Sequence, residues 1–446
     1  MRLRERQTQS STAKTLWTTN TSTAKNNTFN GESNSRSKNR NRSIIQRWIP
    51  FLAGFVVLIL LGRWRIQSIP RVLVLDTTSN VTDTFNWCDR VTNARADLNP
   101  DLAIRYPCET MNSPSAAAVV SVVVCMLTGS VDPNRANKVL FTAREYISGA
   151  MALGFTVRQN IDPSRTHMLL LLKEGFELAP DDILRLRAVG WTIGTAPDFQ
   201  LLKKYVPIYE RYTTTYTKIT AIGLSEYKCA LLMDADTLVV GDLRSLMTCN
   251  KFNHPEHRVA GTLDLDRGRW NGINTGSILW RTSSSEMNRV FQLSRSDTFM
   301  KRFSSDQEFL NNVYPERFNR TLNELIMKGN FPPEHNHGAV VDLTWDYNAQ
   351  THLEGEKVEW WGSQRSNVKI LHFTRRKGWQ CEERYDDPPS LAEMPKTCHR
   401  DKGGLRSKDE APICYCREAH RYYNALKHAK ELGDQAILEH QQQEMK

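Results

Sequence analysis

Continuous apolar runs alternate with helix-like spacings along the middle of the chain. The runs cover residues 116–127, 167–175 and 228–240, and leucine and β-branched residues dominate them. Runs of this kind, without an alternating polar face, are typical of strands that are buried on both faces of a parallel sheet. Between the first two runs, residues 144–159 repeat their apolar side chains at a helical spacing, so we predict a helix there.

The same alternation continues further along the chain. Asp181 and Asp182 precede an apolar pattern that a glycine closes, which predicts a short helix over 183–190 capped by the two aspartates. We also expect a strand at 191–195 and a helix at 216–224. Alternating strands and helices predict an α/β fold with a mostly parallel central sheet and flanking helices.

An uncharged apolar segment near the N-terminus predicts a membrane anchor. Residues 48–62 contain no charged side chain, and as a helix these 15 residues span about 22 Å. Flanking arginines can extend this short span because their side chains reach the membrane–water interface. We therefore predict a transmembrane signal-anchor at residues 48–64. A cleaved signal peptide and a buried core helix are the alternatives. Five basic residues closely precede the segment and three follow it, which favours a cytosolic N-terminus and a lumenal remainder.

The net charge of +10 is concentrated in the N-terminal tail. Residues 1–47 hold ten Lys or Arg and two Asp or Glu, so the tail carries +8 and the rest of the chain only +2. A basic tail with few aromatic residues is better explained as a topology signal than as a surface that binds nucleic acid or lipid. A hydrophobic content of 40% excludes a wholly disordered protein, although the tail lacks the apolar residues needed to fold.

All nine cysteines follow the predicted anchor, which fits an oxidising compartment. Cys88 and Cys108 are candidate disulfide partners, whereas Cys125 and Cys229 lie in apolar strand-like runs where buried thiols are expected. A second candidate disulfide group consists of Cys381, Cys398, Cys414 and Cys416. No pair of cysteines separated by two residues occurs in this late group, which argues against a zinc site.

Two carboxylates follow the buried run that ends at Met233. Asp234 and Asp236 stand at i and i+2 after four apolar positions, at the edge of the sheet where ligands of such folds bind. Carboxylate oxygens suit Mn2+ or Mg2+, and such an ion can bridge a diphosphate. The alternative is a solvated turn at the end of a strand. Asp264 and Asp266 repeat the D-x-D spacing and serve as a measure of how readily it arises by chance.

The residues around this motif resemble the glycosyltransferase family that includes glycogenin, the retaining GT-A enzymes of family 8. The longest similar block is YTKITAIGLSEYKCALLMDADTLVVGDL (216–243). The other similar blocks are Y-x-x-G-A-x-x-L-G from Tyr146, N-T-G-S from Asn274, S-D-Q-E-F-L-N from Ser305, and L-H-F-T from Leu371 with Lys377 and Trp379 after it. All five occur in the family's order and together span about residues 117–380.

The resemblance implies a GT-A fold, which is Rossmann-like, and a metal site. Asp234, Asp236 and His372 resemble the family's ligands of a Mn2+ ion that holds the diphosphate of the donor, with Mg2+ as the alternative ion. Two carboxylates and one imidazole suit Mn2+ better than a purely oxygen site does. An ion in this position neutralises the charge that develops on a diphosphate leaving group.

The same resemblance implies donor-binding and catalytic residues. The donor-binding residues would be Thr128, Tyr146, Lys218, Ala235, Asn274, Thr275, Gly276 and Lys377. Asp306 and Gln307 would be catalytic, with Asp306 nearest to the anomeric carbon as nucleophile or as charge stabiliser. A helix N-cap is the alternative interpretation of Asp306. The late block is one residue shorter than the family's pattern, so Arg375 or Arg376 is an alternative to Lys377 as the diphosphate contact.

These features predict a membrane-anchored, Mn2+-dependent hexosyltransferase. It would transfer a hexosyl or hexuronosyl residue from a UDP-sugar to a hydroxyl of a glycan, glycoprotein or glycolipid, with retention and without nucleic acid as a partner. A non-catalytic relative that binds carbohydrate or nucleotide sugar is the alternative. The expected location is the Golgi membrane, with a type II topology and lumenal N-glycosylation acceptors at Asn80 and Asn319. No motif selects the sugar or the acceptor.

The predicted organisation has five parts. They are a disordered basic cytosolic tail (1–47), a transmembrane signal-anchor (48–64), a stem (65–115), a GT-A catalytic domain (116–380) and a Cys-containing, partly helical C-terminal extension (381–446). We therefore expect all candidate site residues to lie in the fourth part.

Overall fold

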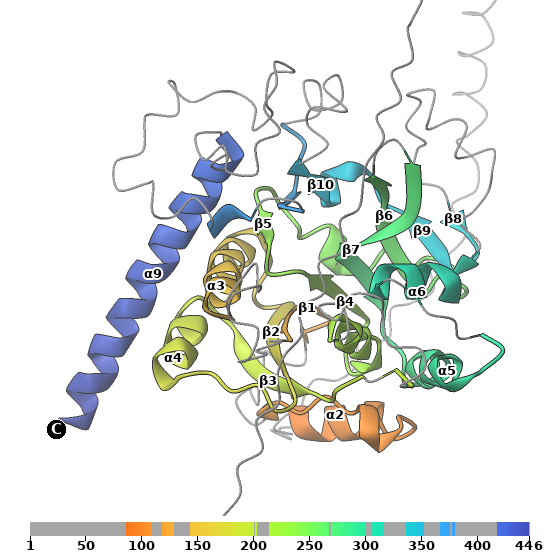
Figure 1. Cartoon of the computed structure of the whole chain (residues 1–446). Coiled ribbons are helices and arrows are strands. Elements are labelled where there is room, and N and C mark those ends of the chain that lie inside the picture. Colours follow the sequence, from red (N-terminus) through yellow and green to blue (C-terminus); the bar gives the residue numbers. More distant parts are fainter. Residues whose placement is uncertain are drawn as a thin grey trace, which may run out of the picture. The chain divides into compact units, whose positions relative to one another are not determined.

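The predicted apolar runs form the strands of a mixed α/β fold in the computed structural model of the chain (Figure 1). The structure describes residues 86–108, 118–128, 143–199, 201–202, 214–266, 269–299, 303, 305–315, 336–351, 366–374, 377–379 and 417–445. The basic tail, the predicted span at 48–64 and the acceptors Asn80 and Asn319 lie outside these residues. Among the helices in the described ranges, none is long and apolar enough to cross a membrane.

The larger sheet carries the predicted parallel strands. Within the described residues it consists of β1 (Ser121–Leu127), β2 (Thr166–Lys173), β3 (Thr192–Ala196), β4 (Cys229–Met233), β6 (Val259–Asp266), β7 (Arg269–Arg281), β8 (Asn336–His337) and β9 (Val340–Asp342). Their spatial order is β3-β2-β1-β4-β7-β6-β9-β8, and β3, β2, β1 and β4 are parallel, which confirms the predicted arrangement. The strand order reverses at β1, so the carboxyl ends of β1 and β4 flank the switch point at which ligands of such sheets bind.

The second half of the sheet departs from the prediction of strand and helix in strict alternation. β7 runs antiparallel to both β4 and β6, and Met233 lies opposite Ser277. β6 and β7 follow one another closely in the chain, and such a short connection allows only antiparallel pairing. A smaller sheet consists of β5 (Thr237–Val239), β10 (Ala349–Gln350) and β11 (Ile370–His372), with β11 between the other two.

Helices cover both faces of the larger sheet because the side chains of its strands alternate between two cores. In β1, Val123 and Cys125 belong to one core, whereas Val122 and Val124 belong to the other. The first core includes residues of α3 (Ala143–Asn160), α4 (Pro180–Ala188) and α9 (Arg417–Glu444). The second includes residues of α2 (Trp87–Ala94), α5 (Ser284–Arg295), α6 (Asp306–Val313) and the 3-10 helix η7 (Thr215–Gly223). Short 3-10 helices also occur at η1 (Pro100–Leu102), η8 (Leu246–Thr248) and η10 (Trp345–Tyr347).

The predicted helices occur with local differences. α3 confirms the helix predicted at 144–159. Asp181 and Asp182 lie in the first turn of α4, where negative charge is favourable, but Ala179 is the N-cap, so the predicted capping is wrong. The segment predicted as a helix at 216–224 is a 3-10 helix, and its many Thr and Ile side chains, which are β-branched, explain why the α-helix is disfavoured.

The C-terminal helix α9 packs along α3 and α4 (Figure 1). Tyr422, Leu426 and Ala429 are buried in the first core, so α9 is an integral part of the folded unit. This confirms the helix predicted at the end of the C-terminal extension, whereas residues 381–416 lie outside the described part of the chain.

Residues 86–108, which fall in the range assigned to the stem, pack against the second core through side chains such as Leu102. A buried ion pair holds the segment, because Arg95 donates to both carboxylate oxygens of Glu226, at 2.8 Å to Oε2. Tyr106 donates to the same carboxylate at 2.7 Å. The side chain of Glu226 is 0% exposed, so its charge depends on these donors.

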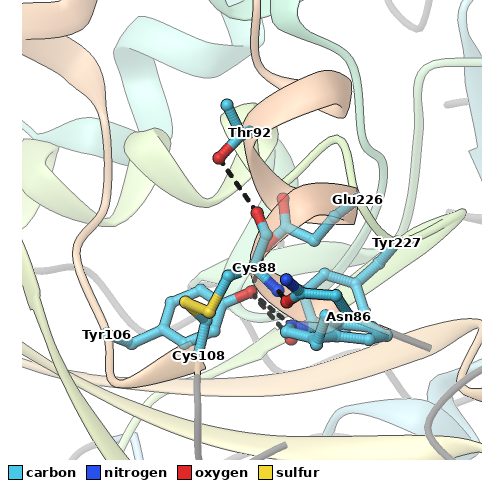
Figure 2. Close-up of a disulfide and its surroundings, with 8 residues drawn as sticks. Asn86, Cys88, Thr92, Tyr106, Cys108, Glu226 and Tyr227 are labelled. Carbon is cyan, nitrogen blue, oxygen red and sulfur yellow. Dashed lines mark hydrogen bonds between the residues drawn. A yellow bond between two sulfur atoms is a disulfide. The ribbon is translucent and has the colours of Figure 1, made fainter. Parts of the chain in front are cut away.

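Two disulfides lie in the described part of the chain. Cys88 pairs with Cys108, as predicted, and the bridge lies beside Tyr106 and Glu226 (Figure 2). Cys229 pairs with Cys249, so the prediction of a buried thiol at Cys229 is wrong. Cys125 is a buried free thiol, as predicted. The loop that contains η8 brings Cys249 back to the start of β4, a contact that strand periodicity does not reveal.

We predict that Glu226→Ala destabilises the protein by about 3–5 kcal/mol, because it leaves the buried Arg95 guanidinium without its counter-charge. The matched control is Glu174→Ala, which breaks an exposed pair with Arg105 and should cost less than about 1 kcal/mol. Urea unfolding followed by far-UV circular dichroism measures both changes. Equal losses in the two variants would contradict the prediction.

We predict that His167 makes the protein less stable in mild acid. Burial lowers the pKa of His167 to about 4, so the unfolded chain, with a pKa of 6.5, binds this proton first. Stability is therefore full above about pH 6.5 and falls as the pH decreases towards 4, by up to about 2 kcal/mol between pH 7 and 5. His167→Gln should flatten the dependence of the thermal midpoint on pH over this window, and an unchanged slope would refute the assignment.

Candidate functional site

The turn that follows β4 places Asp234 and Asp236 at the carboxyl edge of the sheet. The backbone N–H of Asp234 donates to the carbonyl of Gly276 on β7 at 2.8 Å, which ties the start of the turn to the neighbouring strand. The side chain of Asp234 is 36% exposed, whereas that of Asp236 is only 9% exposed. The pair therefore combines one accessible and one buried carboxylate.

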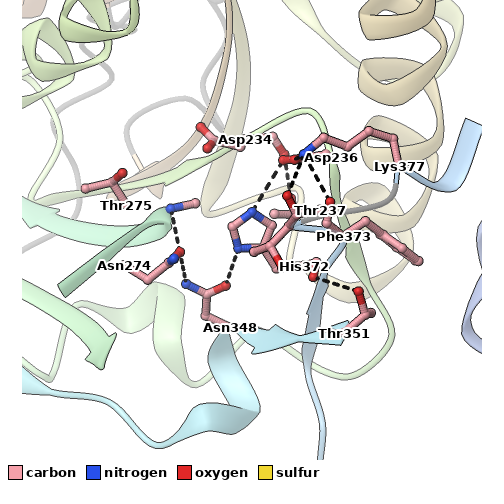
Figure 3. A network of polar contacts seen from close by, with 12 residues as sticks. Asp234, Asp236, Thr237, Asn274, Thr275, Asn348, Thr351, His372, Phe373 and Lys377 are labelled. Atoms are coloured by element: carbon pink, nitrogen blue, oxygen red, sulfur yellow. Dashed lines mark hydrogen bonds and ion pairs between the residues drawn. The ribbon is translucent and has the colours of Figure 1, made fainter. Parts of the chain in front are cut away.

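The smaller sheet brings His372 to the two aspartates. β11 pairs with β5 so that His372 lies opposite Thr237, and the N–H of Phe373 donates to the carbonyl of Asp236 at 2.9 Å. Nε2 of His372 lies 3.5 Å from Oδ1 of Asp236 (Figure 3). One ligand atom each from Asp234, Asp236 and His372 fits within 4.8 Å, so the three predicted metal ligands form a cluster.

The chemistry of this cluster fits a divalent cation. Oδ1 of Asp236 is buried and accepts no hydrogen bond from any described residue. An unsatisfied buried carboxylate oxygen is costly, and a bound cation would relieve that cost. Two carboxylates with one imidazole form a donor set that suits Mn2+, with Mg2+ as the harder alternative.

Lys218 joins two carboxylates of the site. Its ammonium group lies 3.0 Å from Oδ1 of Asp234 and 3.0 Å from Oδ2 of Asp306. Burial alone lowers the pKa of Lys218, but the two carboxylates outweigh burial and raise its pKa above the usual value. Lys218 is therefore a cation held between Asp234 and Asp306.

Lys377 is the second ammonium group at the cluster. It contacts the carboxylate of Asp236 and donates to the carbonyl of Phe373 at 3.0 Å. Burial alone raises the pKa of the Asp236 carboxyl, but the adjacent Lys377 ammonium outweighs burial and holds the pKa well below its usual range. The alternatives Arg375 and Arg376 lie outside the described residues.

Asp306 lies at the start of α6 with its side chain directed into the site. Ser305 is the N-cap of α6, so the interpretation of Asp306 as the cap is wrong. Thr215 donates to Oδ1 of Asp306 at 2.8 Å, and Thr275 donates to Oδ2 at 2.9 Å. Together with Lys218, these donors hold a side chain that is only 6% exposed.

Asn274, Thr275 and Gly276 lie within strand β7 and not in the turn expected from the N-[ST]-G pattern, and Gly276 lies against His372. A Cβ added at Gly276 would overlap the imidazole ring, so only glycine lets the ring lie against the strand. Gln307 accepts from the N–H of Thr275 at 3.3 Å, which links the start of α6 to the same part of β7. The structure therefore brings the predicted residues of three separate sequence blocks together.

Asp264 belongs to the site, although the sequence interpretation uses it as a measure of chance. Asn274 donates to its Oδ1 at 2.9 Å, and Gln307 donates to its Oδ2 at 2.8 Å. Its sequence signal is weaker than that of Asp234, because Gly261 and Thr262 interrupt the run before Asp264, whereas four apolar residues precede Asp234. Asn348 and Thr215 also contact site residues, and neither stands in a motif that could have identified it.

The remaining predicted donor-binding residues are Thr128, Tyr146 and Ala235, and each has identified neighbours. Thr128, at the end of β1, accepts a hydrogen bond from Thr214 at 3.3 Å. Tyr146 on α3 is 37% exposed, and its ring centre lies 5.2 Å from that of Trp379. Ala235 is contacted by α3 at Gly149, where a Cβ would come within 2.5 Å of the Ala235 carbonyl oxygen.

Comparison with known proteins gives limited similarity. No family model matches the chain. Inositol phosphorylceramide glucuronosyltransferase 1 of Arabidopsis thaliana is 25% identical to the chain over 263 residues, which cover 58% of this chain and 44% of that protein. The chain thus spans less than half the length of this curated relative.

Solved structures with partial similarity include two glycosyltransferases. GlyE of Streptococcus pneumoniae TIGR4 gives a TM-score of 0.35 at 14% identity and covers 58% of this chain and 56% of its own. An active-site mutant of LgtC gives a TM-score of 0.41 at 12% identity and covers 69% of this chain and 96% of its own. At TM-scores this low, the description of the fold depends on the chain's own strand order and connections.

We predict that Gly276→Ala weakens Mn2+ binding at least about tenfold, because the added methyl group displaces the His372 ring from the cluster. Titration with Mn2+, followed by the electron paramagnetic resonance signal of the free ion, measures the change. Gly223→Ala is the control, since its nearest neighbours would lie 3.3 Å from the new Cβ. Mn2+ affinity that is equal in the two variants would contradict this geometry.

Proposed function

We propose that the chain is a GT-A glycosyltransferase of the glycogenin-like family 8 type. It transfers a hexosyl or hexuronosyl residue from a UDP-sugar to an acceptor hydroxyl with retention, and it depends on Mn2+. The observation that carries the proposal is the cluster of Asp234, Asp236 and His372 at the carboxyl edge of a switch-point sheet. Lys218, Lys377 and Asp306 adjoin this cluster, so it has the charges that a sugar diphosphate requires.

The curated relative supports the same reaction class. Its name identifies it as a glucuronosyltransferase, and the similarity covers 58% of this chain. Transfer of a hexuronosyl residue is therefore one of the donor specificities to test first.

Donor recognition follows from the charges of the site. Asp234, Asp236 and His372 would hold the cation, which when bound neutralises the negative charge of a diphosphate leaving group. Lys218 and Lys377 add two ammonium groups that lie against the same carboxylates. Asp234 is exposed to solvent whereas Asp236 and His372 are buried, so a donor would reach the cluster from the side of Asp234.

The environment of Asp306 favours front-side attack over a covalent intermediate. Thr215, Thr275 and Lys218 direct donors at its two oxygens, so most of its lone pairs are occupied. A carboxylate held in this way suits stabilisation of an oxocarbenium-like state more than nucleophilic attack. Gln307 and Asp264, hydrogen bonded to each other at 2.8 Å, would line the sugar side of the site.

The cellular setting is part of the proposal. The uncharged run at 48–62 and its basic flank support a single-pass type II anchor with the folded part in the lumen. The shortness of the run supports a Golgi membrane as the location, and the acceptor would be a glycan, glycoprotein or glycolipid. The disulfides Cys88–Cys108 and Cys229–Cys249 fit an oxidising lumen.

We predict that the full chain with Mn2+ releases UDP from one donor among UDP-glucose, UDP-galactose, UDP-glucuronic acid and UDP-N-acetylglucosamine. Asp236→Asn should lower the rate at least about 100-fold, because it removes charge from the buried side of the cluster. Asp242→Asn is the control, since this carboxylate is exposed and, among the described residues, forms its ion pair with nearby Arg244. Chelation of the metal should abolish release in the wild-type protein.

The outcomes separate the proposed enzyme from the non-catalytic alternative. Mn2+-dependent UDP binding without release from any donor would favour a protein that binds nucleotide sugar without turnover. Absence of both release and Mn2+-dependent UDP binding would reject the metal-site assignment. With an acceptor identified, the anomeric configuration of the product, measured by NMR, tests retention.

A further inference from the structure

A line of buried hydrogen bonds connects Asp264 to His372. Asn274 donates from Nδ2 to Oδ1 of Asp264 at 2.9 Å, and Asn348 donates from Nδ2 to Oδ1 of Asn274 at 2.8 Å. Oδ1 of Asn348 lies 2.9 Å from Nδ1 of His372. None of the four side chains is more than 8% exposed, so water does not compete for these bonds. Figure 3 shows the last three residues in this order beside the two aspartates.

The partners of Asn274 fix which atoms donate and which accept along this series of hydrogen bonds. The backbone N–H of Gly276, which can only donate, points at Oδ1 of Asn274 at 3.0 Å. The carboxylate of Asp264, which can only accept when ionised, faces the Nδ2 group. If the Asn274 amide were turned over, two donors would face each other at one end and two acceptors at the other. Its orientation is therefore determined by partners whose roles do not change.

The orientation of the Asn274 amide in turn fixes the orientation of the Asn348 amide and the tautomer of His372. Because Oδ1 of Asn274 accepts, Asn348 must present its Nδ2 group there and its Oδ1 to the imidazole. An amide oxygen only accepts, so Nδ1 of His372 must carry the hydrogen. A neutral imidazole then has its lone pair on Nε2, which lies on the side of Asp236 at 3.5 Å.

This tautomer is the one that a metal ligand needs at this place. A histidine ligand binds through the nitrogen without hydrogen, and a hydrogen bond at the other nitrogen selects which one that is. In the opposite tautomer, an N–H group would point from Nε2 towards Asp236 and would occupy the position of the cation. The cluster of Asp234, Asp236 and His372 therefore depends on a residue outside it.

We propose that Asn348 is a positioning residue that holds His372 in the Nδ1–H tautomer, with Asn274 and Asp264 fixing the orientation of its amide. The inference rests on the proposed metal-dependent function and adds a connection between the cation and the residues on the sugar side of the site. Asn348 is the C-cap residue of η10, so the end of this short helix would determine the tautomer of the candidate metal ligand His372.

The test compares the full wild-type chain with Asn348→Leu, which keeps a similar volume but removes the acceptor. Long-range proton–nitrogen NMR of histidine-labelled protein reports the tautomer, and His372→Ala identifies the signal. We expect one tautomer in the wild-type protein and a mixture in Asn348→Leu. Mn2+ affinity, measured from the resonance of the free ion, should fall about 10–100-fold in the variant.

The matched control is Asn311→Leu. Asn311 is also buried and accepts from the N–H of Ile273 at 2.8 Å and donates to the carbonyl of Gln307 at 2.8 Å. It is not hydrogen bonded to the His372 ring, so its loss should lower stability while the His372 tautomer stays single. Asn348→Asp is the conservative variant, because it keeps an acceptor towards Nδ1–H and should preserve the tautomer even if the Leu variant does not fold.

The results separate this inference from the proposed function. A single Nδ1–H tautomer in folded Asn348→Leu, a mixture in Asn348→Asp, or unchanged Mn2+ affinity in Asn348→Leu would overturn the role of Asn348. Failure of the proposed function has a different signature, in which the wild-type chain shows the single tautomer but binds no Mn2+. A single tautomer together with Mn2+ binding in the wild-type protein, both impaired in Asn348→Leu, would establish the inference.

Discussion

The pairing of β11 with β5 is the interaction on which the site depends. It sets His372 opposite Thr237 and lets the N–H of Phe373 donate to the carbonyl of Asp236 at 2.9 Å, so a histidine from a distant part of the chain reaches the turn after β4. Closing so long a loop costs conformational entropy, and burial of apolar side chains such as Leu371 offsets that cost. The cluster of Asp234, Asp236 and His372 is therefore a product of tertiary pairing and not of the D-x-D motif alone.

Charge balance is the second constraint on the site. Asp234, Asp236 and Asp306 are compensated by Lys218, which bridges two of them, and by Lys377, which contacts the third. Buried charges are tolerated only when they are paired and hydrogen bonded. The pairing also fixes the side chains before a donor binds, which reduces the reorganisation needed during the reaction. The charged groups that hold the site together are thus the same groups that we propose to act on the donor.

The sequence predicts the parallel half of the sheet and most of the site, because both depend on local patterns. Apolar runs identify β1, β2 and β4, and the D-x-D turn identifies Asp234 and Asp236. His372 could be predicted only from the family resemblance, since no local pattern distinguishes it from another strand histidine. The disulfide of Cys229 and the antiparallel β6–β7 pair were missed, because each depends on partners that are set by tertiary contacts.

The two D-x-D sequences differ in their partners and not in their spacing. Asp236 keeps one buried oxygen that accepts no hydrogen bond from the described residues, and that oxygen lies on the side of His372. Both oxygens of Asp264 instead accept from amide groups, Asn274 on one side and Gln307 on the other. A carboxylate whose lone pairs are directed at N–H donors is a poor metal ligand but a good reference for orienting amides. The same D-x-D spacing therefore gives a candidate cation ligand at Asp236 and, at Asp264, a carboxylate that orients amide side chains.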